Sequence, residues 1–125
     1  MRSLYVVSLL VFSLGLTSSA LAHPPDVLDL YYCPNGKVLS IQAFHGSKSE
    51  TDHYVNKITV ELNGKKIIEQ KFNSQFDREH QEAVFKIIDA KIGDKFKVTA
   101  HCNISGKVSD TLTVKECEHD TEKGE

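Results

Sequence analysis

Four residues of this sequence could act as ligands for a transition metal: His23, His45, His53 and Cys102. Imidazole nitrogen and thiolate sulfur are donors that proteins use to bind iron, copper and zinc. The histidines are spread over 31 positions and Cys102 lies far beyond them, so only the fold can bring the four together. Whether the chain forms a metal site therefore depends on the elements that carry these residues.

Alternation of apolar and polar residues predicts strands rather than helices. The segments 37–45 and 57–62 both place apolar side chains at every second position, which is typical of a strand with one buried face. Asn63 and Gly64 follow directly, and both residues tolerate positive φ, so a type I′ hairpin turn is expected there. The segment 73–81 is polar and predicts at most a helical turn.

The chain is expected to form one all-β domain. We predict strands at 26–32, 37–45, 57–62, 66–72, 82–88, 95–102 and 107–116. About seven short strands in such a domain indicate an immunoglobulin-like antiparallel β-sandwich. The domain is predicted to cover residues 23–117, followed by a charged flexible tail at 118–125.

Strand parity predicts where the potential ligands lie. If each strand reverses the direction of the one before, His23 precedes the first strand and His45 ends the second. His53 then precedes the third strand, and Cys102 ends the sixth. All four residues are expected at one pole of the sandwich.

The same parity argument places Cys33 and Cys117 together at the opposite pole. The sequence has three cysteines, so at least one cysteine has no partner within the chain. We expect a Cys33–Cys117 disulfide, which leaves Cys102 as a free thiol. The alternative for Cys102 is a buried apolar residue without a metal.

The first 22 residues predict an export signal. Arg2 precedes the apolar stretch Leu4–Leu16, and Ala20-Leu21-Ala22 fits the small-residue rule for cleavage. A retained anchor is the alternative, but the apolar stretch is shorter than the roughly 20 residues that span a bilayer. The protein is therefore expected to be periplasmic or secreted, with no membrane contact after cleavage. Lysines and acids alternate along the chain without a basic stripe, so we expect no nucleic-acid partner.

Three segments resemble the superoxide reductases, the neelaredoxin and desulfoferrodoxin iron domains. Residues 45–55, HGSKSETDHYV, are similar to the histidine loop of that family. Residues 98–106, VTAHCNISG, resemble its cysteine motif, and the Cys-Asn-Ile-x-Gly match is the most specific part. His23-Pro24-Pro25 resembles the early His-Val-Pro that supplies the first family histidine.

The resemblance implies a mononuclear non-haem iron that reduces superoxide to peroxide by one electron. It assigns His23, His45 and His53 as imidazole ligands and Cys102 as the axial thiolate. Ser105 stands where the family has a fourth histidine, and His80, at the correct pole, is the better substitute; His101 should point to the other face of its strand.

The implied substrate is superoxide or another small-molecule oxidant, and the resemblance names no electron donor. The family lysine before the first histidine is absent, since Ala22 occupies its position. Lys48, in the loop between two potential ligands, is a weak candidate for attracting the superoxide anion instead.

Two other functions remain open at the level of sequence. Cleavage after Ala22 would give His23 a free α-amine, and an amine with two imidazoles is a copper-binding arrangement, so copper is the alternative metal. The protein is then a non-catalytic periplasmic carrier of iron or copper. A purely structural sandwich that binds no metal is the third possibility.

Overall fold

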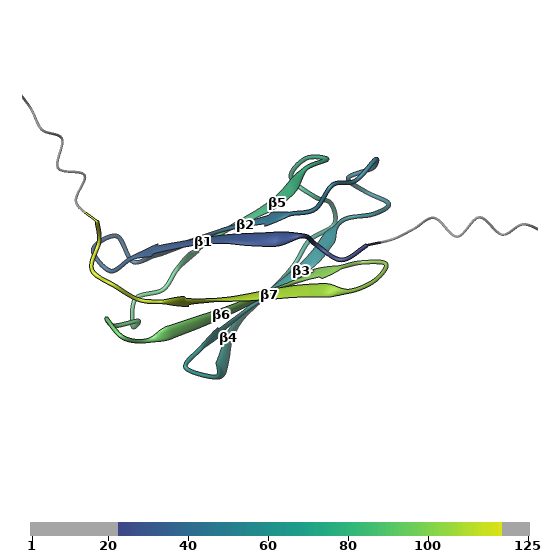
Figure 1. Ribbon diagram of the computed structural model, residues 1–125. Helices are drawn as coiled ribbons and strands as arrows, with labels where there is room; N and C mark the ends of the chain where they lie inside the picture. The colour runs from purple at the N-terminus through teal and green to yellow at the C-terminus, as the bar shows by residue number, and fades with distance from the viewer. Residues whose placement is uncertain (1–22, 119–125) are drawn as a thin grey trace, which may run out of the picture.

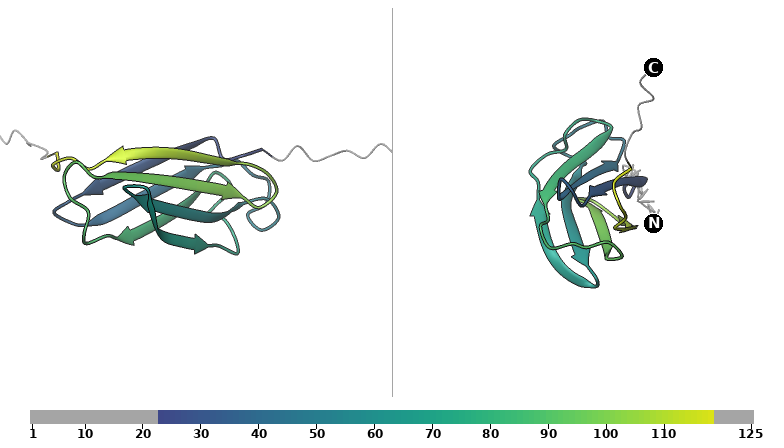
Figure 2. Two further views of the ribbon diagram at one scale, coloured as in Figure 1. Left: turned by 90° about the horizontal axis from the view of Figure 1, so that it is seen from below. Right: turned by 90° about the vertical axis from the view of Figure 1, so that its left-hand side faces the viewer.

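The computed structural model describes residues 23–118, which form two antiparallel β-sheets packed face to face (Figure 1, Figure 2). The expected signal peptide and residues 119–125 of the expected tail lie outside the described residues. The strands are β1 Val27–Cys33, β2 Val38–Phe44, β3 Val55–Leu62, β4 Lys65–Lys71, β5 His80–Lys86, β6 Lys95–Cys102 and β7 Lys107–Thr113. Residues 23–118 include no helix that is long and apolar enough to cross a membrane.

The predicted antiparallel sandwich of seven strands is confirmed. One sheet has the order β1-β2-β5 and the other β4-β3-β6-β7. The hairpin at Asn63 and Gly64 determines where β4 lies. Both residues have positive φ (50° and 83°), as a tight two-residue turn requires, and they alone separate β3 from β4. β4 must therefore pair with β3, whereas in immunoglobulin constant domains the fourth strand joins the first sheet.

Side chains from the inner faces of both sheets form a single core. Alternation is clear in β2, where Leu39, Ile41 and Ala43 are buried between half-exposed neighbours. The core consists of Leu28, Tyr32, Leu39, Ile41, Ala43, Val55, Ile58, Val60, Ala83, Ile87, Phe96, Val98, Ala100 and Val114. This core gives the loops at the two ends of the sandwich a rigid base.

Two strands begin two residues earlier than the sequence predicts. β3 starts at Val55 and β5 at His80. The register of β3 against β6 shifts between Val55 and Lys57, which interrupts the period of two that the prediction used. Val55 is nevertheless fully buried and pairs with Cys102, so the first residues of β3 lie directly beside the end of β6.

The predicted disulfide is confirmed. Cys33 at the end of β1 is bonded to Cys117 after β7, with 5.1 Å between their Cα atoms. The bond links the first and last strands, and it lies at the pole opposite His23. Cys102 is free, as parity predicted, and it is buried.

Candidate metal centre

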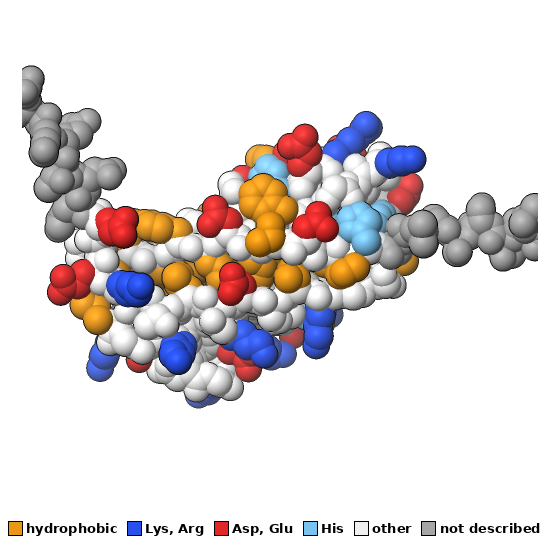
Figure 3. Space-filling view, in the orientation of Figure 1, with side chains coloured by type: hydrophobic (Ala, Val, Ile, Leu, Met, Phe, Trp, Pro, Cys, Tyr) orange, Lys and Arg blue, Asp and Glu red, His pale blue; other side chains and the backbone are white. Residues whose placement is uncertain are grey.

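Three histidines from separate parts of the chain form one cluster. The segment before β1 carries His23, the residue after β2 is His45, and the loop before β3 carries His53. Each offers a ring nitrogen, and these three atoms all lie within 4.8 Å of one another. The ring centroids are 4.6 to 5.2 Å apart. Figure 3 shows histidine side chains at this pole, beside charged loops.

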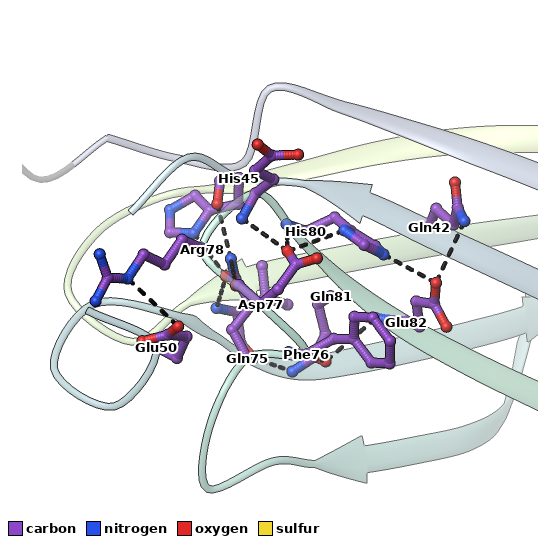
Figure 4. A network of polar contacts seen from close by, with 12 residues as sticks. Gln42, His45, Glu50, Gln75, Phe76, Asp77, Arg78, His80, Gln81 and Glu82 are labelled. Carbon is purple, nitrogen blue, oxygen red and sulfur yellow. Dashed lines mark hydrogen bonds and ion pairs between the residues drawn. The ribbon is translucent and has the colours of Figure 1, made fainter. Parts of the chain in front are cut away.

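His45 is fully buried and held by the amide of Gln75 (Figure 4). The orientation of that amide is determined by its other partners. Gln75 Nε2 donates to the carbonyl oxygens of His45 and Asp77, at 2.8 and 2.9 Å. Its Oε1 accepts from the Val55 N–H at 3.0 Å and faces His45 Nδ1 at 2.9 Å. Since a carbonyl oxygen only accepts, His45 Nδ1 carries the proton and donates it to Gln75.

The neutral form of His45 therefore has its lone pair on Nε2. That nitrogen lies 3.1 Å from the carbonyl oxygen of His23. Two acceptors at this distance repel each other unless a proton or another cation lies at the nitrogen. A metal cation would remove the conflict without charging the ring.

His53 supplies a second nitrogen that lacks a protein partner. Its Nε2 is buried and, among residues 23–118, forms no hydrogen bond. Burial lowers the pKa of His53, and the nearby His45 and His23 rings lower it further, while a backbone hydrogen bond with His23 opposes the shift. The imidazole is therefore neutral at physiological pH, which is the form that binds metals. This orphaned nitrogen and the His45 lone pair together fit the requirements of a bound metal ion.

Asn103, directly after β6, fixes the loop that carries His53. Its side-chain Oδ1 accepts from the Tyr54 N–H at 2.8 Å, and its Nδ2 donates to the Asp52 carbonyl at 3.0 Å. Its backbone N–H donates to the Tyr54 carbonyl at 2.9 Å. The residues on both sides of His53 are thus bonded to one asparagine, which limits the movement of the ring between them.

The third histidine, His23, depends on a close contact between the N-terminal segment and the β6–β7 turn. Gly106 has φ +79°, and a Cβ atom there would lie 2.6 Å from Cβ of Pro24. Only glycine allows this approach. The two ring nitrogens of His23 each face a carbonyl oxygen at 2.9 Å, on Pro24 and on Gly46. A neutral imidazole can donate to only one of them, so one nitrogen keeps a lone pair.

A surface pocket of about 880 Å³ opens beside the cluster. His23 and His53 line it together with Lys48, Arg78 and Ile104. The Arg78 guanidinium is 3.4 Å from the Glu50 carboxylate, whereas Lys48 forms no ion pair among the described residues. A small anion could therefore reach the histidines past a free ammonium group.

Cys102 is not part of the group formed by the three histidines. It follows Phe96, Val98 and Ala100 on the core-facing side of β6, and its Sγ accepts a hydrogen bond from the Ile104 N–H at 3.5 Å. The residue lies at the expected pole and pairs with Val55, two positions from His53. Ligation by its thiolate remains a prediction.

The other two histidines near this pole have different surroundings. His80 lies 3.0 Å from Asp77 Oδ1 and 2.8 Å from Glu82 Oε1, so carboxylates engage both its nitrogens. The hydrogen bond to Glu82 raises the pKa of His80, and the charges of both carboxylates add to the shift against desolvation. His101 points to the outer side of β6, as expected. Neither belongs to the cluster.

Sequence reasoning located the three histidines but missed Gln75. The residue lies in the polar segment 73–81, whose composition predicts at most a helical turn, yet it is only 3% exposed. One signal was present in the sequence: two glutamines, Gln75 and Gln81, flank the start of the strand at His80. Their burial and their partners become visible only in the fold.

The comparisons with known proteins assign no family. No family model matches this chain, and no curated protein matches it significantly. The site has to be interpreted from its own geometry.

Proposed function

We propose that this protein binds one transition-metal ion through His23, His45 and His53. The observation that carries the proposal is the buried His53 Nε2, which forms no hydrogen bond among residues 23–118, beside His45 Nε2, whose partner is the His23 carbonyl oxygen, itself an acceptor. Buried polar atoms are normally satisfied, so an orphan of this kind indicates a missing partner. A metal cation satisfies both nitrogen lone pairs and the carbonyl oxygen together.

We further propose that the bound ion serves one-electron reduction of superoxide, with iron as the metal. This step rests on the resemblance of residues 45–55 and 98–106 to the superoxide reductases. Ferrous iron, when bound, would supply the electron that, with two protons, converts superoxide to hydrogen peroxide. Cys102 is the proposed thiolate ligand, and the Ile104 N–H bonded to its sulfur would stabilise the negative charge. The ammonium group of Lys48 beside the pocket would attract the anion.

The test is metal binding by the purified protein and by two histidine variants. We expect one iron per chain by elemental analysis, loss of that stoichiometry in His53→Gln, and full retention in the control His80→Gln. A thiolate-to-iron charge-transfer band in the oxidised protein should disappear in Cys102→Ser, and superoxide consumption should disappear with it. Absence of stoichiometric metal in the wild type would overturn the site.

A non-catalytic metal carrier is the second candidate. It is favoured by the composition of the cluster, which contains three imidazoles and no thiol and therefore suits copper as well as iron. A carrier would bind copper more tightly than iron, would show no thiolate band, and would bind normally in Cys102→Ser. The same titrations therefore separate the two functions.

A further inference from the structure

Four basic residues stand directly opposite one another across the four-stranded sheet. In the observed register Lys71 of β4 pairs with Lys57 of β3, Lys57 pairs with His101 of β6, and His101 pairs with Lys107 of β7. We call these four residues the basic row. With neighbouring strands about 4.8 Å apart, the row is roughly 14 Å long.

The basic row lies on the outer face of the sheet. Residues that alternate with it, such as Ile58 and Ala100, are in the core, whereas Lys71 and Lys107 are exposed and Lys57 and His101 are partly exposed. Figure 3 shows Lys and Arg side chains, with Asp and Glu side chains among them, on the side of the molecule where the four-stranded sheet lies. The molecule thus carries a local positive surface although its formal net charge is −2.

The three lysines of the row form no ion pair within residues 23–118. Glu69 lies two positions before Lys71 on β4, and its carboxylate is bonded to Lys66 at 2.6 Å. That hydrogen bond lowers the pKa of Glu69, and the charges of Lys57 and Lys71 add to the shift. Like charges directly opposite each other in a sheet are destabilising, so the row is a cost to the fold in the absence of a ligand.

A pocket lies against one part of the row. It has a volume of about 400 Å³ and is lined by Lys57, Lys71 and His101 together with the side chains or backbone of Asn56, Phe72, Asn73 and Cys102. Two ammonium groups, two amides and an imidazole offer many hydrogen-bond donors, and no carboxylate lines the pocket. This donor set is complementary to an oxyanion.

We propose that the outer face of the four-stranded sheet binds a small phosphate- or sulfate-type oxyanion at Lys57, Lys71 and His101. Lys107 extends the positive surface beyond the pocket, so anions with linked phosphate groups bind more tightly than single ones. The site is separate from the histidine cluster, because the row points away from the core that lies between the two sheets.

The test is a titration of the full chain with inorganic phosphate, sulfate and pyrophosphate, followed by amide chemical shifts at constant ionic strength. Saturable shifts should concentrate at residues 56–57, 71–73 and 101, with pyrophosphate binding more tightly than phosphate. Lys57→Gln should weaken binding roughly tenfold, which corresponds to the loss of about 1.4 kcal/mol. Lys97→Gln is the matched control, since Lys97 lies on the same face of β6 but pairs with Glu61.

The unliganded stability gives a second, independent readout. Lys57→Gln should unfold at a higher temperature than the wild type without anion, because it removes like-charge repulsion, and should gain less from added pyrophosphate. Equal binding by Lys57→Gln, Lys97→Gln and the wild type would overturn the proposal. Binding of a polyanion such as heparin without binding of any small oxyanion would overturn it as well.

Discussion

A single amide determines which nitrogen of His45 is available to a ligand. The side chain of Gln75 makes four hydrogen bonds, and its two donated bonds to the His45 and Asp77 carbonyls leave Oε1 as the acceptor for His45 Nδ1. The proton is thereby kept on Nδ1 and the lone pair on Nε2. Partners of this kind behind a metal-binding histidine fix its tautomer and orientation.

Replacing Gln75 should weaken metal binding beyond its effect on stability. Gln75→Leu removes the acceptor for His45 Nδ1, so we expect a metal affinity about 10 to 100 times lower, measured by competition with a chelator. Gln81→Leu is the matched control. Gln81 is equally buried and also makes four hydrogen bonds, to Val55, Ser74, Phe76 and Glu82, but none to a histidine.

Both glutamine variants should unfold more easily, by about 1–3 kcal/mol for the buried groups left unpaired. Only Gln75→Leu should also lose affinity for the metal in its folded state. If both variants lose affinity equally, Gln75 acts through the general rigidity of segment 73–81 and not through the tautomer of His45.

At the scale of elements, the β6–β7 turn holds the segment that carries His23. Gly106 permits Pro24 to approach at a distance that no other residue allows. Gly93, in the turn before β6, has a similar backbone conformation with φ +93°, but a Cβ atom there would meet nothing within 4 Å. Substitutions at the two glycines therefore distinguish the effect of backbone strain, present at both, from the effect of steric contact, present only at Gly106.

Gly106→Ala should displace the imidazole of His23 from the candidate metal centre, whereas Gly93→Ala should not. Each substitution forces a non-glycine residue to positive φ, so we expect a loss of about 1–2 kcal/mol of stability in both variants. Gly106→Ala must in addition displace Pro24 and with it His23, which should reduce metal affinity. Chelator competition together with urea unfolding measures both effects, and equal metal affinity in the two variants would contradict the role assigned to the turn.

Sequence patterns predicted which residues lie at each end of the sandwich better than which residues lie opposite each other on its faces. Strand parity depends only on the number of reversals, so it placed His45 and His53 at one pole and Cys33 and Cys117 at the other. Register between strands is not encoded in any single segment, and the basic row of Lys57, Lys71, His101 and Lys107 was therefore invisible as a stripe in the sequence. For the same reason parity could place Cys102 at the correct pole but could not decide whether its thiol reaches the histidines.

At the scale of the whole molecule, the covalent constraint and the candidate metal centre lie at opposite poles. The disulfide joins residues separated by 84 positions and ties β1 to the chain after β7. The histidine cluster is held instead by Gln75, Asn103 and Gly106, all at the other end of the core. Disulfides of this kind are common in exported proteins. The two features should therefore contribute to stability independently.

Removal of the disulfide should lower stability strongly and leave the metal centre intact. In the chain-entropy description, closing a loop of this length stabilises the fold by about 4–5 kcal/mol, so the double variant Cys33→Ser with Cys117→Ser should lose that amount in urea unfolding. Both cysteines are replaced together, because a single replacement would leave one free thiol that could pair with Cys102. Metal should bind the folded double variant with wild-type affinity. Because the metal binds only the folded chain, it should increase the free energy of unfolding of both proteins by the same amount. A lower metal affinity in the folded double variant would mean that the two poles are coupled through the core and that the bond positions the histidines from a distance.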